Sequence, residues 1–182
     1  ECAELAPETF GISASSLSLR FKTASAARLR QLQERGLERY DFVAIFVDGK
    51  RFADDGLMIA LGITIEGKKI ILGIEQTATE NSRALEQFFE KLIQRGLNYK
   101  EGIFFVIDGA KGIAKAIERI FSSIAIIQRC QYHKVENVIS YLPKGMQRIW
   151  RVKLRAAYQE TKYDSAKRAL GKLELELREI NP

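Results

Sequence analysis

The stretch FVAIFVDG at residues 42–49 decides the fold, because here an apolar run ends in an acid and a glycine. The same pattern returns later in the chain as IFFVIDG at residues 103–109. A nearly continuous apolar run of this length indicates a buried strand rather than a half-exposed one. Glycine after the acid favours a sharp exit from a sheet. We therefore predict two buried strands that end in Asp48 and Asp108.

The two aspartates allow two interpretations. If the strands are parallel neighbours, both carboxylates reach the same edge of the sheet and form a site for a hard divalent cation, which prefers oxygen ligands. Alternatively, each aspartate caps a turn or the helix that follows it. The pattern in a single strand favours the cap, and its repetition makes the metal site an equal alternative.

Length and composition indicate a globular protein with one core. The chain has 182 residues, of which 46% are hydrophobic and 29% charged, as in soluble globular domains. No stretch is apolar for long enough to span a bilayer, and no signal-peptide pattern opens the chain. Cys2 and Cys130 provide no disulfide framework, which fits a reducing compartment. Because the chain begins at Glu1 and ends at Pro182 in a charged helical pattern, we expect a fragment of a longer protein.

The positive charge is concentrated near the end of the chain. The formal net charge is +6, and residues 144–172 alone hold nine Lys or Arg against two acids, Glu160 and Asp164. A basic segment beside a nearly neutral remainder favours a polyanionic partner, most often nucleic acid. A solvated helical face is the other interpretation.

The first 40 residues are predicted to be helical. Two short helices meet at residues 10–12, Ser13 caps the second, and Leu17 and Phe21 lie on its buried side. A further helix over residues 23–35 ends at Gly36. The first pair fits either the end of a DNA-binding helix-turn-helix or a plain helical hairpin.

The middle of the chain predicts a mixed sheet. Residues 49–56 are expected to form a polar loop, and strands over residues 57–66 and 69–75 then complete an antiparallel meander. Thr77 and Glu80 have capping-box spacing for the next helix, which ends at Gly96. The core-facing positions of this helix and of the one after residue 109 are Leu85, Phe88, Phe89, Leu92, Ile93, Ile113, Ile117, Ile120 and Phe121.

The order of these elements predicts the topology. Strand, helix, strand, helix and strand after a meander give parallel strands joined by crossovers, the last strand covering residues 124–128. We expect an α/β fold with a mixed five-stranded sheet in the order 3-2-1-4-5, flanked by helices. In that order Asp48 and Asp108 lie side by side. The topology therefore favours the interpretation of the two aspartates as a metal site over their interpretation as turn caps.

The only histidine of the chain, His133, follows the fifth strand in the motif CQYHK, residues 130–134. Cys130 and His133 have the spacing of half a zinc site, but a structural site needs four ligands and the chain offers no second pair. We therefore expect no structural zinc. His133 is interpreted as a partner of the carboxylates, as a phosphate contact, or as an ordinary residue at a helix start.

Beyond residue 143 the pattern is helical. Helices are predicted over residues 146–159 and 164–180, and the second carries an apolar face that requires a partner helix, for which a segment beyond Pro182 is one candidate. We divide the chain into a helical segment (1–40), an α/β core (41–143) and the start of an all-helical segment (144–182).

Several motifs together resemble one family, the Mutator-like transposases in their bacterial insertion-sequence branch. These motifs are DFVAIFVDGKRF (41–52), LGIE (72–75), TEN (79–81), VIDGAKG (106–112) and CQYHK (130–134). Their order and spacing make the resemblance specific from about residue 12 to about residue 144, and it is looser in the helical tail.

The resemblance implies a ribonuclease-H-like fold, a DDE triad and a helical insertion before the third acid. Asp48 and Asp108 match the first two acids, and the third, a glutamate, has no matching position before Pro182. We assign no catalytic role to the glutamates of the insertion-like helices, which are Glu160, Glu174, Glu176 and Glu179.

The implied activity is metal-dependent cleavage and strand transfer of DNA. Two Mg²⁺ or Mn²⁺ ions about 3.5–4 Å apart can activate a water or a 3′-hydroxyl and stabilise the leaving oxygen. We assign Asp48 to bridge both ions and Asp108 to hold one, and we count His133 with them as catalytic. The implied partners are the terminal repeats of an element, its target DNA and further copies of the chain, in the bacterial cytoplasm at the nucleoid and away from membranes. A catalytically incomplete DNA-binding remnant and a structure-specific nuclease are the competing hypotheses.

Eight cations are expected to contact DNA phosphates, whose contacts are mainly electrostatic. Some flank the acids and others lie on the basic helices: Lys50, Arg51, Lys111, Lys134, Arg148, Arg151, Lys153 and Arg155.

Overall fold

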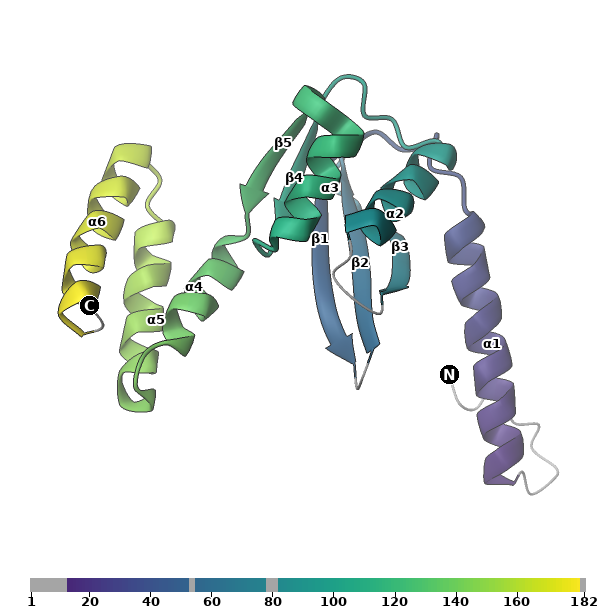
Figure 1. Cartoon of the computed structure of the whole chain (residues 1–182), viewed down its shortest axis with the longest axis horizontal. Helices are drawn as coiled ribbons and strands as arrows, with labels where there is room; N and C mark the ends of the chain where they lie inside the picture. The colour runs from purple at the N-terminus through teal and green to yellow at the C-terminus, as the bar shows by residue number, and fades with distance from the viewer. Residues whose placement is uncertain (1–12, 53–54, 78–81, 181–182) are drawn as a thin grey trace.

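The computed structural model describes residues 13–52, 55–77 and 82–180. A five-stranded sheet with helices beside it forms the centre, α1 leaves it on one side, and a group of three helices lies on the other (Figure 1). No helix in these ranges is long and apolar enough to cross a membrane. The strands are β1 (Phe42–Phe52), β2 (Asp55–Thr64), β3 (Lys69–Thr77), β4 (Ile103–Ile107) and β5 (Ala125–Arg129). The helices are α1 (Ala14–Glu34), α2 (Ser82–Gln94), α3 (Lys111–Phe121), α4 (Gln131–Ser140), α5 (Lys144–Tyr158) and α6 (Tyr163–Ile180), with a short 3-10 turn at Ser122–Ile124.

The sheet has the predicted order, β3-β2-β1-β4-β5. The first three strands pair antiparallel, whereas β4 pairs parallel with both β1 and β5. This mixed topology confirms the predicted α/β class and is that of a ribonuclease-H-like fold.

The polar loop predicted over residues 49–56 is wrong. β1 continues to Phe52 and β2 begins at Asp55, so only residues 53 and 54, which lie outside the described part, separate the two strands. The pairing with β4 ends at Val47 opposite Ile107, but the pairing with β2 continues, for example at Lys50 opposite Leu57. Backbone hydrogen bonds of a local antiparallel hairpin therefore keep these polar residues in a strand.

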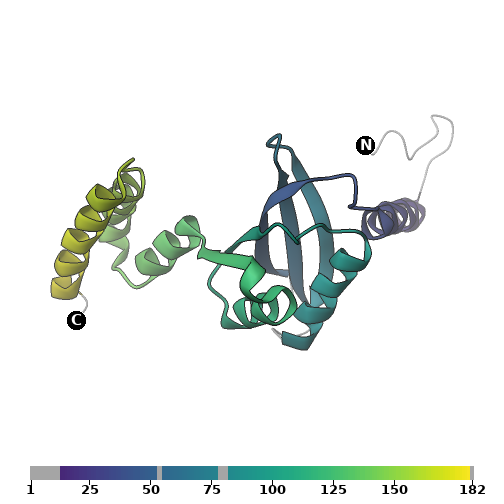
Figure 2. The ribbon, with the colours of Figure 1, turned by 90° about the horizontal axis from the view of Figure 1, so that it is seen from above.

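The main core lies between the sheet and the helices α2 and α3, which cover one of its faces (Figure 2). At its centre Phe105 of β4 meets Phe121 of α3, with ring centroids 4.9 Å apart, and Phe89 of α2, at 5.9 Å. The predicted inward positions of both helices are confirmed as buried or packed against this core. Thr77 is the last residue of β3 and α2 is described from Ser82, while the predicted capping partner Glu80 and the side chain of Thr77 lie outside the described part.

The expectation that the Asp strands are buried on both faces is also wrong. Side chains alternate along β1 and β4, so that Ile45 and Phe105 are fully buried while Phe46 and Phe104 remain 40% and 37% exposed. Val43 of β1 and Ile126 of β5 are exposed as well. The apolar run predicted two covered faces, but the described helices cover only one.

The N-terminal helices differ from the prediction. Residues 14–34 form the single helix α1, without a break between residues 22 and 23, and residues 10–12 lie outside the described part. The cap is confirmed, because the Ser13 side chain accepts a hydrogen bond from the Ser16 N–H. Leu17 and Phe21 are exposed, at 38% and 58%, because α1 extends away from the core (Figure 1).

Arg95 attaches the end of α1 to the core. Its guanidinium donates to the carbonyl oxygens of Leu32 and Arg35 at 2.8 and 2.9 Å, and to that of Leu72 in β3 at 2.7 Å. The carbonyls in the last turn of a helix lack partners within the helix. Burial lowers the pKa of Arg95 from its usual value, with a smaller contribution from the nearby charge of Arg35.

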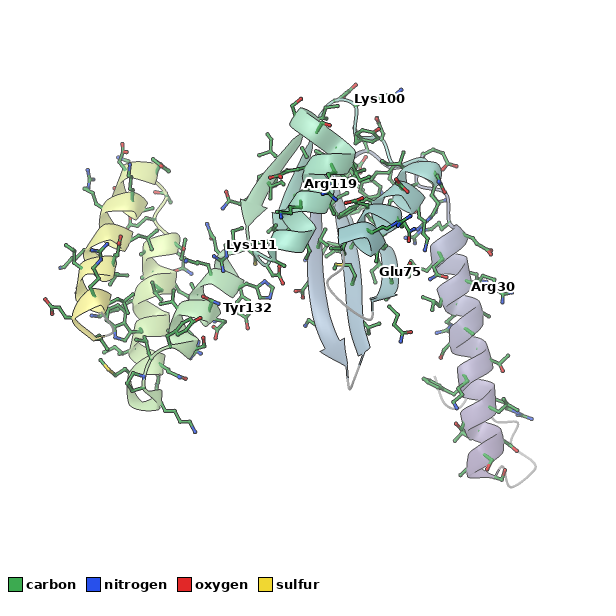
Figure 3. The ribbon with its side chains drawn as sticks, in the orientation of Figure 1. Arg30, Glu75, Lys100, Lys111, Arg119 and Tyr132 are labelled. Carbon is green, nitrogen blue, oxygen red and sulfur yellow. The ribbon has the colours of Figure 1, made fainter. Side chains whose placement is uncertain are left out.

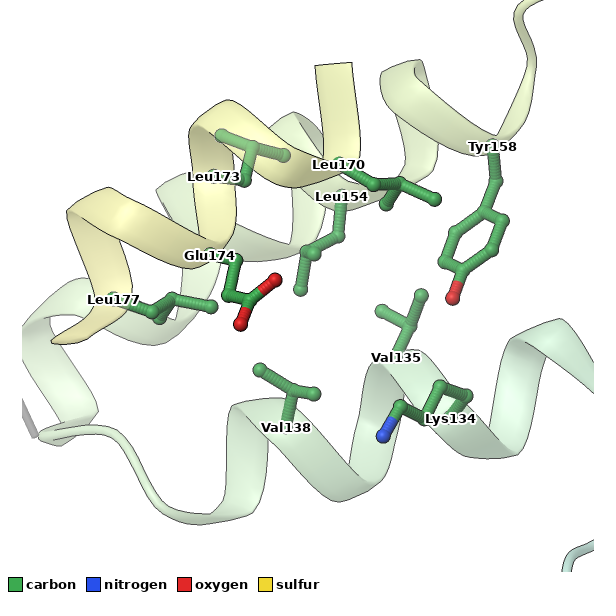
Figure 4. A pocket seen from close by; sticks show the side chains of 9 residues that line it. All are labelled: Lys134, Val135, Val138, Leu154, Tyr158, Leu170, Leu173, Glu174 and Leu177. Carbon is green, nitrogen blue, oxygen red and sulfur yellow. The ribbon is translucent and has the colours of Figure 1, made fainter. Parts of the chain in front are cut away.

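The helices α4, α5 and α6 form a second, smaller core, and both predicted tail helices are confirmed. Trp150 and Leu154 of α5 pack with Leu173 of α6 and Val135 of α4. The apolar face of α6 therefore has partners within the described chain. Between the helices an apolar groove of about 360 Å³ stays open, with Lys134 and Glu174 at its edge (Figure 4).

Candidate active site

The strand register brings the two aspartates together. β1 and β4 run parallel, and the last pair of their ladder is Val47 with Ile107. Asp48 and Asp108 are the next residues of the two strands, and both side chains are partly buried. The predicted pairing of strands one and four therefore places both acids at one edge of the sheet.

Asp108 also caps a turn, which was the alternative to a metal-binding role in the sequence analysis. Its Oδ1 accepts a hydrogen bond from the Ala110 N–H at 2.8 Å, and Gly109 between them has a φ of +101°. The turn leads from β4 into α3. Because this bond occupies one of the two carboxylate oxygens, the turn fixes the carboxylate and leaves its other oxygen for a further ligand.

His133 lies beside Asp48, as in the interpretation that made it a partner of the carboxylates. The Cys130 N–H donates to the Ile107 oxygen at 2.7 Å, and α4 begins directly afterwards at the same edge of the sheet. The His133 Nε2 is 3.6 Å from Asp48 Oδ1, a contact that becomes an ion pair only when the imidazole is protonated. Its Nδ1 is buried and has no hydrogen-bond partner among the described residues.

Arg129 is a site residue that sequence reasoning missed. It is the last residue of β5 and pairs with Ile107, next to Asp108. A Cβ built on Gly109 would lie 2.5 Å from its Nε and 2.9 Å from its Cζ, so the guanidinium lies against the backbone of the Asp108 turn. The sequence signal was its position, since the end of the fifth strand shares an edge with the ends of the first and fourth.

The side chains present suit a hard cation but do not complete a site. Carboxylate oxygens are the ligands that Mg²⁺ prefers, and Asp48 and Asp108 supply them from adjacent strands. Within the described ranges, no three His, Cys, Asp or Glu side chains gather as a metal-binding group. The donor set therefore fits the first two acids of a divalent-metal site and requires at least one further ligand.

Two of the cations predicted for DNA lie next to the acids. Lys50 follows Asp48 by two residues, on the same face of β1, and Lys111 is the first residue of α3; both are exposed. Lys111 lies on the side of the core that faces Tyr132 at the start of α4 (Figure 3). Arg51 belongs to β1, but its side chain is outside the described part.

Three cations of α5 are engaged within the helical segment. Arg151 donates from Nε and Nη2 to the two carboxylate oxygens of Glu136, both at 2.9 Å, and Arg155 lies 3.6 Å from the same carboxylate. The hydrogen bonds from Arg151 hold the pKa of Glu136 below its usual value. Lys153 pairs with Glu176 of α6 at 2.6 Å and lies over the Trp150 ring, 4.7 Å from its centroid.

The remaining two of the predicted DNA-contacting cations, Lys134 and Arg148, lie on α4 and α5. Lys134 lines the apolar groove between α4 and α6 (Figure 4). Arg148 is exposed on α5. The structure thus places Asp48, Asp108 and His133 at one edge of the sheet, with His133 in contact with Asp48. The predicted DNA-contacting cations that it describes lie next to the acids, on α5 and at the groove.

Residues 3–179 match the family model described as transposase, Mutator family. The chain belongs to the Mutator family of transposases. Curated relatives in this family include the transposase for insertion sequence element IS256 in transposon Tn4001 of Staphylococcus aureus, 31% identical over 115 residues. The transposase for IS6120 of Mycolicibacterium smegmatis is 27% identical over 170 residues, and that for ISRM5 of Rhizobium meliloti is 29% identical over 168 residues.

These Mutator-family relatives are longer than the chain. The matches cover 63%, 90% and 87% of this chain but 29%, 51% and 41% of the respective relatives. The chain therefore spans about half or less of the length of the relatives it matches.

Proposed function

We propose that this chain is part of the catalytic domain of a transposase that cleaves and joins DNA strands with divalent metal ions. The observation that carries the proposal is the parallel pairing of β1 with β4, which sets Asp48 and Asp108 side by side in a chain of the Mutator family. Two carboxylates at one sheet edge are the donors that a Mg²⁺ or Mn²⁺ site for phosphodiester chemistry needs.

Each residue of the site has a task in this proposal. Asp48 and Asp108 hold the metal, which when bound would activate a water or a 3′-hydroxyl and stabilise the leaving oxygen. The turn at Gly109 orients the Asp108 carboxylate through the Ala110 N–H. His133, 3.6 Å from Asp48, restricts the orientation of that carboxylate. The proposal assigns no residue of this chain as the third acid.

A second candidate is a DNA-binding remnant without catalysis. The observation in its favour is that the described residues gather no group of three metal-binding side chains. In such a protein the acids would only cap turns, as Asp108 does with Ala110. DNA binding would then be independent of metal and unchanged by Asp48→Asn.

The test is calorimetric titration of Mn²⁺ into the chain and into Asp48→Asn and Asp108→Asn. We expect the wild type to bind Mn²⁺, and either substitution to weaken binding at least tenfold, because each removes a charged ligand. Circular dichroism checks that both variants stay folded. Mn²⁺ affinity that survives both substitutions, together with metal-independent DNA binding, would favour the remnant. Strand transfer as opposed to hydrolysis is measured on the full-length protein, and hydrolysis alone would favour the structure-specific nuclease.

A further inference from the structure

The feature that the proposed function leaves unused is the guanidinium of Arg129. Its backbone is held at the end of β5 by the pairing with Ile107 and by the hydrogen bond from the Cys130 N–H to the Ile107 oxygen. Its side chain crosses the turn after Asp108, against Gly109. The backbone of Arg129 is thus held next to the two acids by the same ladder that positions them.

Arg129 is exposed and makes no hydrogen bond or ion pair through its guanidinium to any described residue. Three arginines elsewhere in the fold do have such partners: Arg95 donates to three carbonyl oxygens, Arg151 binds Glu136, and Arg119 binds Glu86. Asp108, which follows β4, accepts a hydrogen bond from the Ala110 N–H at one of its oxygens. The structure therefore holds a cation beside the acids without neutralising it.

The start of α3 adds further donors at the same place. α3 begins at Lys111, and its N-cap residue, Ala110, provides no side-chain cap. The N–H groups in the first turn of a helix lack partners within the helix and favour an anion. The exposed ammonium of Lys111 lies on this turn.

We propose that Arg129, with the first turn of α3, forms a subsite for one phosphate group of the DNA strand beside the metal-binding acids. The proposal rests on the proposed function and specifies which residues hold the substrate there. A guanidinium presents its donors in a planar fork that binds two oxygens of a phosphate at once. The two carboxylates repel this anion, and a cation next to them offsets that repulsion and adds a contact to the one that the metal makes.

The subsite is tested by binding of a short fluorescent DNA duplex to the chain in the presence of Mn²⁺, measured by anisotropy over a series of salt concentrations. Arg129→Gln is expected to weaken binding about tenfold, the loss of one charge-assisted contact. It should also make the plot of log affinity against log salt concentration less steep, by the amount expected for the loss of about one phosphate contact. Arg129→Lys should recover the slope and only part of the affinity, because it keeps the charge and loses the fork.

Lys100→Gln is the matched control, because it removes one exposed positive charge at the opposite end of the core, before β4 (Figure 3). It should leave the affinity within about a factor of two. The proposal is overturned if Arg129→Gln and Lys100→Gln have the same affinity and salt slope, or if the wild type does not bind DNA at low salt. Mn²⁺ titration of Arg129→Gln separates the two proposals, since the subsite can fail while the acids still bind metal, and the acids can fail while Arg129 still contacts DNA.

Discussion

At the scale of single residues, the site depends on a glycine as much as on its acids. Gly109 has a φ of +101°, a conformation that residues with a side chain rarely adopt. Its missing side chain also leaves the space that the Arg129 guanidinium occupies. One position thus turns the chain after Asp108 and lets a cation lie against that turn.

A comparison of Gly109→Ala with Gly67→Ala should separate the effect of the positive φ from the effect of the space that Gly109 leaves for Arg129. Gly67 also has a positive φ, +78°, but a Cβ there would meet nothing within 4 Å. Both substitutions should destabilise the protein by about 1–2 kcal/mol through backbone strain, as measured by denaturant unfolding. Arg129 is exposed and can move aside, so the added contact should cost little stability.

Only Gly109→Ala should weaken DNA binding, because it displaces the guanidinium from the Asp108 turn. Anisotropy with the duplex used for Arg129 measures this. Equal DNA affinity of the two glycine variants would contradict the role given to the space above Gly109.

At the scale of secondary-structure elements, α4 joins the site to the helical segment. Its first turn carries His133 beside Asp48, and its Glu136 binds Arg151 of α5 through both oxygens. The orientation of α5 relative to α4 is therefore fixed by a pair of charges as well as by the second core. Substitutions of Glu136 or Arg151 should therefore disturb the packing of α4 on α5 more than they disturb the sheet.

The Glu136–Arg151 pair predicts an acid-sensitive contribution to stability. The pKa of Glu136 is lowered in the folded protein, by the hydrogen bonds from Arg151 first. A group whose pKa falls on folding stabilises the protein above its unfolded pKa, about 4.3 for glutamate, and this contribution is lost as the pH falls through the folded value. The wild type should therefore have a higher melting temperature than Glu136→Gln at pH 7, and this difference should be smaller at pH 3.

Thermal unfolding followed by circular dichroism at both pH values tests the contribution of Glu136. Glu174→Gln is the control, because Glu174 makes one exposed pair with Arg178 on the same helix, and such pairs contribute little. If Glu136→Gln and Glu174→Gln lower the melting temperature equally at pH 7, the bidentate pair does not hold α4 on α5.

At the scale of the whole molecule, the sheet has one covered and one open face. Helices α2 and α3 pack on the covered face, and the described helices leave Val43, Phe46, Phe104 and Ile126 exposed on the other. Neighbouring residues of one strand therefore differ in how much they contribute to stability.

Phe105→Ala and Phe104→Ala test this arrangement in adjacent positions of β4. Phe105 is fully buried among aromatic rings, and its truncation should cost about 3–5 kcal/mol of unfolding free energy. Phe104 is 37% exposed, and its truncation should cost about 1 kcal/mol, because less apolar area returns to water. Urea unfolding of both variants decides, and equal losses would mean that the second face is also buried in solution.

The sequence by itself determined the sheet, its strand order and the adjacency of Asp48 and Asp108. The strands follow from local hydrophobic patterns, and their order follows from the rules for crossover connections between parallel strands. Both can be read from the sequence of a single chain. The sequence also identified the buried apolar faces of α2 and α3, because apolar residues that recur with the helical period mark the face that packs against the core.

Only the tertiary structure decided what the side chains at the edge do. The sequence could not show that Asp108 both caps a turn and faces the site, that Arg129 lies against Gly109, or that Arg151 and Lys153 pair within the helical segment. It also could not show that one face of the sheet stays open or that β1 and β2 extend through residues 49–52 and 55–56. The physical reason is that such contacts join residues distant in sequence, and their geometry is fixed only once the strands and helices have packed.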